Sequence, residues 1–217
     1  MPFTTKSIVH ETMMAPGVEN RQHAFGVFMD TFNAMRNYFL EHYEKGIGMF
    51  IPSVGAFFFD NIHDARTDRP ARIPRFVFLA HFLSRSGLQC PKDQNADTLD
   101  LNMGSLFETK GPMHRINWTT VAGKAGLTPA DCKEAWDLLL KTLQSNILSG
   151  VDGSVDFGIG TFTVNNFRGG MKLKKWVQAD LCNNGTLGVV KTNQAMTTLG
   201  TFRVTEQYPR GTTIIRK

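Results

Sequence analysis

The chain has 217 residues, a formal net charge of +5 at pH 7 and 41% hydrophobic residues. This length predicts one or two domains, and the apolar content is that of an ordinary globular protein. No apolar run approaches the roughly 18 residues of a membrane span, and the first 14 residues lack the apolar stretch of a secretory signal. The basic charge permits an acidic partner, such as nucleic acid, an anionic membrane or an acidic protein surface, without choosing among them.

The three cysteines, Cys90, Cys132 and Cys182, are odd in number and far apart in the sequence. Their spacing matches neither a zinc site nor a disulfide framework. We therefore expect reduced thiols in an intracellular compartment, and no metal or other cofactor.

The first part of the chain predicts a short helix over residues 6–15 and a long amphipathic helix that begins near His23. Gly46 and Gly48 are expected to end the long helix. Its apolar side chains recur at spacings of three and four residues, which indicates one face directed toward a core. That face consists of Phe25, Phe28, Met29, Phe32, Met35 and Phe39.

A short glycine-containing pattern follows this helix and occurs twice in the chain. Gly55 and Phe57 in the first copy align with Gly160 and Phe162 in the second, each at an offset of 105 residues. In each copy an apolar strand leads into the glycine and a second strand follows it. Glycine there suits a bulge or tight bend, and the phenylalanine two residues on shares its face of the strand. The chain is therefore predicted to contain two related units in tandem.

The first unit continues with a polar, arginine-rich stretch over residues 60–74, a third strand, and a short helix that ends at Gly87. Residues 89–112 are rich in proline, glycine, asparagine and aspartate, which is typical of a linker. We accordingly assign the first domain to residues 1–88 and the linker to residues 89–112.

The second domain is predicted to repeat this order of elements over residues 113–182. Asn117 is expected to cap its first helix. Thr128 at the N-cap and Pro129 at the first helical position indicate a longer helix that ends at Gly150. The apolar face of this helix consists of Cys132, Ala135, Trp136, Leu139, Leu143 and Ile147.

The second glycine-containing strand pair, a turn over residues 165–170 and a third strand over residues 171–177 complete the unit. Residues 183–217 are rich in glycine, asparagine and threonine, and we expect an extended tail with one strand-like run over residues 201–204. The predicted fold class is α+β: two tandem domains, each with helices packed on a small three-stranded antiparallel sheet, followed by the tail.

The order of elements and three short motifs resemble the bacterial HU/IHF fold. The motifs are Ile-Gly-Thr-Phe at 159–162, Ala-Gly-Leu-Thr-Pro at 125–129 and Ile-Pro-Ser-Val-Gly-Ala-Phe at 51–57. Two such units in one chain are similar to the paired HU domains of the coiled-coil-domain-containing protein 81 family, whose first domain typically carries Phe-Ile-Pro-x-Val-Gly-x-Phe and then Arg-Phe-Val-Phe-Leu. The resemblance covers about residues 20–182.

This resemblance implies a structural protein of centrosomes, cilia and axonemal microtubules rather than a DNA-bending protein. It also implies a location in the cytoplasm and cytoskeleton, at the axoneme of a cilium or flagellum, or at the basal body or centrosome. The two units could form an intramolecular pseudo-dimer, because half of an HU body exposes its apolar face, or each could dock separately on a partner.

DNA bending by HU-type proteins needs two long β-arms with arginines and a wedge residue that unstacks a base step. The second unit offers only residues 165–170 between its strands, which are too few to wrap a duplex. The first unit has an arginine at every third position, close to prolines, which is typical of a polyproline II segment with aligned guanidiniums. These arginines are Arg66, Arg69, Arg72 and Arg75.

Such a row of guanidiniums could pair with phosphates or with carboxylates. Asp60, Asp64 and Asp68 precede or interleave with it, so a self-neutralised, solvated loop is an equal alternative. If the arginines do bind a partner, an acidic protein surface is favoured over nucleic acid.

Two further groups of basic residues are candidate partner-binding residues. The first is Arg168, Lys172, Lys174 and Lys175, with no acidic residue between positions 165 and 175; a solvated strand face is the plain alternative. The second lies in the tail, where a basic clamp along an acidic filament is a hypothesis. It consists of Arg203, Arg210, Arg216 and Lys217.

The sequence holds little that predicts catalysis. Its six histidines form no metal-binding pair, no motif surrounds a serine or cysteine nucleophile, and no glycine-rich phosphate loop occurs. We therefore expect a non-enzymatic structural or binding protein, a component of ciliary or flagellar doublet microtubules that docks on tubulin or on neighbouring microtubule-associated proteins. The alternatives are an HU-type architectural DNA-binding protein and a scaffold whose partner is another protein of its complex.

Overall fold

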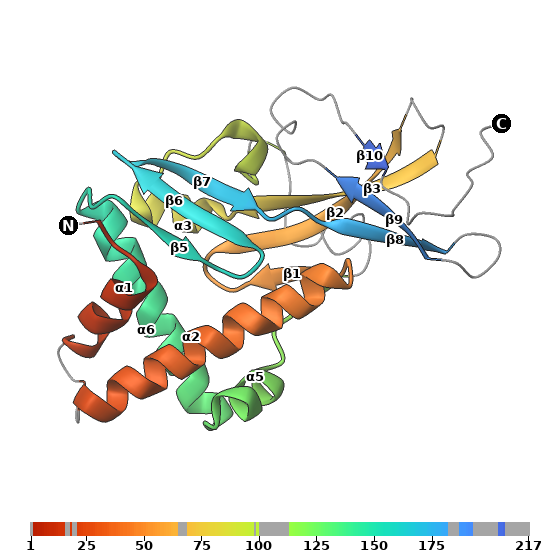
Figure 1. Ribbon diagram of the computed structural model, residues 1–217. Helices are drawn as coiled ribbons and strands as arrows, with labels where there is room; N and C mark the ends of the chain where they lie inside the picture. The colour runs from red at the N-terminus through yellow and green to blue at the C-terminus, as the bar shows by residue number, and fades with distance from the viewer. Residues whose placement is uncertain are drawn as a thin grey trace.

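Two similar series of helices and strands follow each other in the computed structural model of the chain (Figure 1). The structure describes residues 2–15, 18, 21–64, 69–97, 99, 113–181, 187–192 and 204–206. The first series is α1 (Thr5–Met13), α2 (Arg21–Glu44), β1 (Gly48–Ile51), β2 (Gly55–Asp64), β3 (Arg69–Phe78) and α3 (Ala80–Ser86). The second is α5 (Trp118–Ala125), α6 (Pro129–Leu148), β5 (Gly153–Asp156), β6 (Gly160–Asn165) and β7 (Arg168–Leu173). The α+β class predicted from the sequence is confirmed.

The helix boundaries follow from the local chemistry that the sequence displays. The Asn117 side chain accepts a hydrogen bond from the Thr120 amide at the start of α5. The Thr128 hydroxyl accepts one from the Asp131 amide at the start of α6, over 3.2 Å. Gly87 ends α3 in the left-handed region, with φ of 67°, where glycine has no steric penalty.

The two series build separate small sheets. The second sheet has the strand order β5-β6-β7 and is three-stranded and antiparallel, as predicted. The first has the order β3-β2-β1-β4 and therefore one strand more than predicted. The extra strand, β4 (Met113–His114), lies directly after the expected linker, at the start of the predicted second domain, and runs parallel to β1.

The two repeated glycines are the first residues of β2 and β6, directly after the tight connections at 52–54 and 157–159, and each pairs in register with the neighbouring strand, so the expected bulge is absent. Neither glycine has a positive φ. A Cβ atom on Gly55 would lie 2.1 Å from the Val77 carbonyl oxygen, and one on Gly160 would lie 2.4 Å from the Lys172 carbonyl oxygen. Glycine is needed because the neighbouring strand passes so close. Phe57 and Phe162 share the glycine's face and are buried in the core, as predicted.

Both series contribute to one shared main hydrophobic core. The Phe78 and Phe162 rings are 5.6 Å apart, and the Phe39 and Trp136 rings are 5.9 Å apart, each pair joining one series to the other. The helices cross over in the same way: α1 packs on α6 and α5 packs on α2. In Figure 1, α2, α5 and α6 accordingly lie together below the strands.

The predicted apolar face of α6 is buried along its whole length. The predicted face of α2 is largely buried, but Phe25 is 38% exposed, so its assignment to the core is wrong. Ala24 takes the buried position instead. Because Ala24 lies four residues before Phe28, it continues the stripe that faces the core, while Phe25 lies at its margin.

Part of the expected linker is a packing element. Residues 92–94 form the short 3-10 helix η1 (Lys92–Gln94), and the Ala96 amide donates to the Phe78 carbonyl at the end of β3. Ala96 and Met113 are buried in a second small core. The few apolar side chains in and next to this polar stretch are therefore the ones that pack on the outer face of the first sheet. The assigned domain boundaries stay a prediction.

The described parts of the expected tail are extended, as predicted, but they are strands paired in a sheet, which the sequence did not predict. They are β9 (Leu187–Thr192) and β10 (Val204–Glu206), which form a third antiparallel sheet with β8 (Val177–Leu181) in the order β10-β9-β8. The expected strand over residues 171–177 is also divided, since β7 ends at Leu173. The short runs of β-branched residues are broken by glycine, which hides the strand pattern in the sequence.

Candidate binding surface

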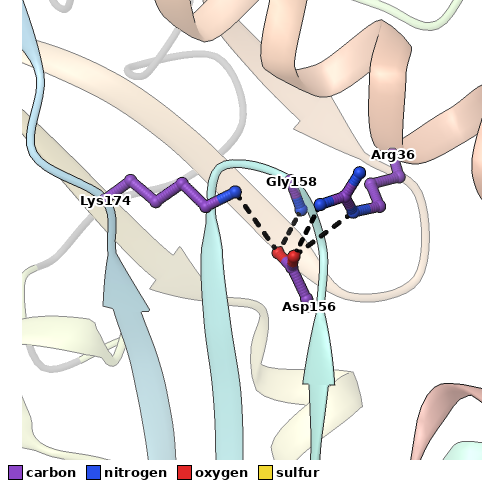
Figure 2. A network of polar contacts seen from close by, with 4 residues as sticks. All are labelled: Arg36, Asp156, Gly158 and Lys174. Carbon is purple, nitrogen blue, oxygen red and sulfur yellow. Dashed lines mark hydrogen bonds and ion pairs between the residues drawn. The ribbon is translucent and has the colours of Figure 1, made fainter.

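Asp156 joins side chains and backbone from both series of elements (Figure 2). Its Oδ2 accepts a hydrogen bond of 2.7 Å from the Arg36 guanidinium on α2, and its Oδ1 accepts one of 2.8 Å from the Gly158 amide. The Lys174 ammonium lies 3.7 Å from Oδ1. Burial opposes ionisation of this carboxyl, but the hydrogen bonds from Arg36 and Gly158 outweigh it and lower the pKa of Asp156.

The segment after β7 crosses from the second series to the first. The Tyr43 hydroxyl on α2 donates a hydrogen bond of 2.6 Å to the Lys174 carbonyl. Trp176 is 5% exposed, and its ring centroid lies 4.8 Å from that of Phe59 on β2. These contacts and the Asp156 network fix the second sheet against α2 and the first sheet.

The outer faces of the two sheets, which point away from the shared core, have opposite character. On the first sheet this face carries Phe58 and Val77, which are fully buried beneath Ala96 and Met113. On the second sheet it is polar and exposed. The exposed residues, named the open face from here on, are Ser154, Thr161, Thr163, Asn165, Arg168 and Lys172.

The expected polyproline II segment is wrong for residues 69–75, because they belong to β3, which pairs with β2 in a ten-residue register; the strand expected to follow is the end of the same β3. Alternate residues of a strand point to opposite faces, so Arg72 and Arg75 are separated. The Arg72 guanidinium lies 5.1 Å from the centroid of the Phe59 ring. Arg75 Nε lies 2.7 Å from Asp60 Oδ2, on the opposite face of the strand pair. Both arginines therefore have contacts within the fold.

The structure brings together only part of the second predicted group of basic residues, which runs from Arg168 to Lys175. Arg168 and Lys172 lie on the open face. Lys174 and Lys175 follow β7 and are exposed, and Lys174 is drawn to Asp156. Among the residues that the structure describes, Arg168, Lys172 and Lys175 have no carboxylate within ion-pair distance, so their charges are available to a partner.

The remaining candidates lie outside the part of the chain whose side chains are described. Arg69 is placed only as a member of the β3 backbone. The others are Arg66, Arg203, Arg210, Arg216 and Lys217.

A pocket of about 190 Å³ lies where the edge strands β3 and β7 of the two sheets approach each other. Phe76 and Met171, which are 2% and 3% exposed, contribute apolar walls, and Lys172 and Asp93 contribute opposite charges. This cavity, the seam pocket, is lined by Pro74, Arg75, Phe76, Asp93, Gln94, Met171, Lys172 and Leu173.

The seam pocket is closed on one side by Gln94, whose side-chain amide pairs with the edge of β7. Its Nε2 donates to the Met171 carbonyl over 2.9 Å, and its Oε1 accepts from the Met171 amide over 2.8 Å. The backbone of Gln89 pairs with β7 in a similar way, through the Phe167 carbonyl and the Gly169 amide. The pocket is therefore held by segments from three parts of the chain.

Sequence reasoning missed Arg36, Asp93, Gln94 and Asp156. Asp156 and Gly158 do precede the repeated glycine motif, and an aspartate that accepts from the amide two residues on is a common turn feature. Arg36, however, is 120 residues away from Asp156, and no local pattern relates them. Nothing in the sequence around Gln94 signals that its side chain pairs with a strand.

No protein-family model matches the chain, and no curated protein matches it. Within the described residues, no helix is both long and apolar enough to cross a membrane. The same residues contain no cluster of three or more histidine, cysteine, aspartate or glutamate side chains that could hold a metal ion.

Proposed function

We propose that the protein is a non-enzymatic docking protein built from two HU/IHF-like units fused into an intramolecular pseudo-dimer, and that it binds an acidic protein surface. The observation that carries this proposal is the contrast between the outer faces of the two sheets. One is covered by the chain itself, and the other presents Arg168 and Lys172 among exposed hydroxyl and amide side chains. The outer face of the second sheet is therefore the proposed docking face.

The HU-like assignment is supported by the order helix, helix, three antiparallel strands, which occurs in both series. It is also supported by the packing of the helices of one series on those of the other. A shared core of this kind is what two halves of an HU body would need, because neither half alone buries its apolar face.

The proposed partner is the microtubule of a ciliary or flagellar doublet, either the tubulin lattice or a neighbouring microtubule-associated protein. The support is the resemblance of the motifs at 51–57 and 159–162 to the paired HU domains of a ciliary and centrosomal family. The net charge of +5 suits an acidic lattice. The proposed location is accordingly the axoneme, or the basal body and centrosome.

The test is co-sedimentation of the chain with polymerised microtubules and, in parallel, with duplex DNA across a salt series. We expect pelleting with microtubules, and DNA binding that is weak and lost steeply as salt rises. The variant Arg168→Glu should reduce microtubule pelleting several-fold, whereas Lys133→Glu, the same charge change on the exposed side of α6, should not. Tight DNA binding that survives salt, without microtubule pelleting, would overturn the proposal.

An architectural DNA-binding protein is the second candidate because β2 and β3 form a long ribbon of ten residue pairs, which has the form of one HU arm. The second series counts against it. Its β6–β7 hairpin turns through only Asn166 and Phe167, both with positive φ, and so provides no second arm. The covered outer face of the first sheet also removes the two-fold surface that a symmetric duplex would meet.

A further inference from the structure

We propose that the seam pocket receives one apolar side chain of an acidic partner segment, and that this insertion, rather than charge alone, gives the docking face its specificity. This inference rests on the proposed function, because it specifies which chemical groups of the acidic partner bind at the same docking face. The pocket adjoins the open face, because Lys172 belongs to both.

The size of the pocket matches one side chain. Its volume of about 190 Å³ is close to that of cavities that hold a single benzene ring, about 150 Å³. Phe76 and Met171 are almost fully buried beneath it, and Pro74 and Leu173 complete an apolar wall. A leucine or phenylalanine side chain could therefore pack against this apolar wall, while Arg75, Asp93, Gln94 and Lys172 line the rest of the pocket.

The shape of the pocket is fixed before a partner binds. The two hydrogen bonds between Gln94 and the Met171 backbone tie η1 to β7. The ion pair between Arg75 and Asp60 holds the Arg75 side chain on its strand. Because the pocket walls are already ordered, binding does not incur the entropy cost of ordering them.

The charges around the pocket favour an acidic segment. Lys172 has no carboxylate within ion-pair distance among the described residues, and Arg168 lies on the same face of β7. Asp93 on the opposite wall is the one acidic side chain that lines the pocket. It would repel an acidic partner, so removal of its charge should strengthen binding unless the pocket is filled at the same time.

The experiment uses the full chain and two fluorescein-labelled nine-residue peptides, each with four glutamates on either side of a central leucine or alanine. We expect fluorescence anisotropy to show about tenfold tighter binding of the leucine peptide, from burial of its side chain. Lys172→Glu should weaken both peptides at least several-fold. Lys133→Glu, which makes the same charge change away from the pocket, should leave both unchanged.

Two substitutions at one position separate the pocket from the surrounding charge. Asp93→Asn should strengthen binding of both peptides, whereas Asp93→Phe, which removes the same charge but fills the cavity, should abolish the preference for leucine. Circular dichroism on each variant confirms that the fold is intact.

Each outcome of the peptide experiment bears on the inference separately from the proposed function. Equal affinities for the leucine and alanine peptides, or an unchanged leucine preference in Asp93→Phe, would overturn side-chain insertion. Absence of binding by either peptide would overturn the acidic-segment inference. Co-sedimentation with microtubules tests the proposed function independently, because it does not depend on the central residue of a peptide.

Discussion

At the scale of single residues, Asp156 is a polar residue that joins the two series, because its carboxylate accepts from Arg36. It contacts Arg36 on α2, the Gly158 amide in its own turn and Lys174 beyond β7. A Cβ atom on Gly158, whose φ is 85°, would lie 2.4 Å from the Arg36 carbonyl oxygen. The turn therefore fits against α2 only with glycine, and the carboxylate is held directly beside the helix.

Substitution of Asp156 should destabilise the fold in a pH-dependent way. We expect Asp156→Asn to lower the free energy of unfolding by about 1 kcal/mol at neutral pH, since the carboxylate is 40% exposed and partly screened. Because folding lowers its pKa, the stabilisation is fully present above the ordinary value of 3.8 and is lost as the pH falls below that value through the lower pKa of the folded state. Urea denaturation at neutral pH and near pH 3 measures this.

The exposed Asp30 on α2 provides the control for this experiment. Asp30→Asn should leave the free energy of unfolding almost unchanged at both pH values. A difference between wild type and Asp156→Asn that persists undiminished near pH 3 would mean that the lost stability does not come from the ionised carboxylate.

At the scale of elements, the tight approach of β7 to β6 depends on Gly160. A methyl group there would meet the Lys172 carbonyl oxygen and the Leu173 Cα atom, so the strands would have to separate. Gly123, in the exposed part of α5, has nothing within 4 Å of its Cβ position. Alanine would therefore clash at Gly160 but fit without contact at Gly123.

Alanine substitution should consequently change stability in opposite directions at these two sites. Gly160→Ala should lower the free energy of unfolding by about 2 kcal/mol or more, through overpacking. Gly123→Ala should raise it by about 0.5–1 kcal/mol, because alanine loses less backbone entropy in a helix. Thermal and urea unfolding of both variants measures the pair. Similar effects at the two positions would contradict the close approach of the strands.

The elements that could be predicted from the sequence are those determined by neighbours in the chain. Thr128 and Pro129 predicted the start of α6, and the spacing of its apolar residues predicted its buried face. The sequence predicted only the last residues of β3 as a strand and not residues 69–75, because the prolines and arginines there hide the alternation that pairing with β2 imposes. The pairing of β4 with β1 and of Gln94 with Met171 joins distant segments, and no local propensity encodes it.

The candidate site was predictable only as a set of basic residues. Arg168 and Lys172 were identified correctly as exposed charges, whereas Arg72 and Arg75 proved to have contacts within the fold. The seam pocket was not foreseen, because its walls come from β3, η1 and β7, which meet only after both sheets have formed.

At the scale of the whole molecule, the shared core makes the two series one folding unit. Phe32 and Phe39 of α2 contact Trp136 of α6, and Phe82 of α3 lies 6.4 Å from Phe162 of β6. Neither series buries these rings without the other. We therefore expect the two series to fold and unfold together rather than as two independent domains.

We expect the full chain to be monomeric and to unfold in a single cooperative transition. Calorimetric and van't Hoff enthalpies should agree, and tryptophan fluorescence and circular dichroism should give coincident curves. Residues 1–100 and 113–217, expressed as separate chains, should each be largely unfolded. Two resolved transitions in the full chain, or a cooperatively folded isolated half, would contradict the single core.

The difference between the two outer faces has a further consequence for orientation. In a homodimer encoded by one sequence, any substitution appears on both halves, so a lid over one sheet would also cover the other. Here the halves are encoded separately, and Ala96 and Met113 cover the first sheet while Thr161 and Lys172 remain exposed on the second. Of these two faces only the second is open, so the docking proposed above would hold the protein on its partner in a single orientation, and a filament with two different ends would bind it in one direction.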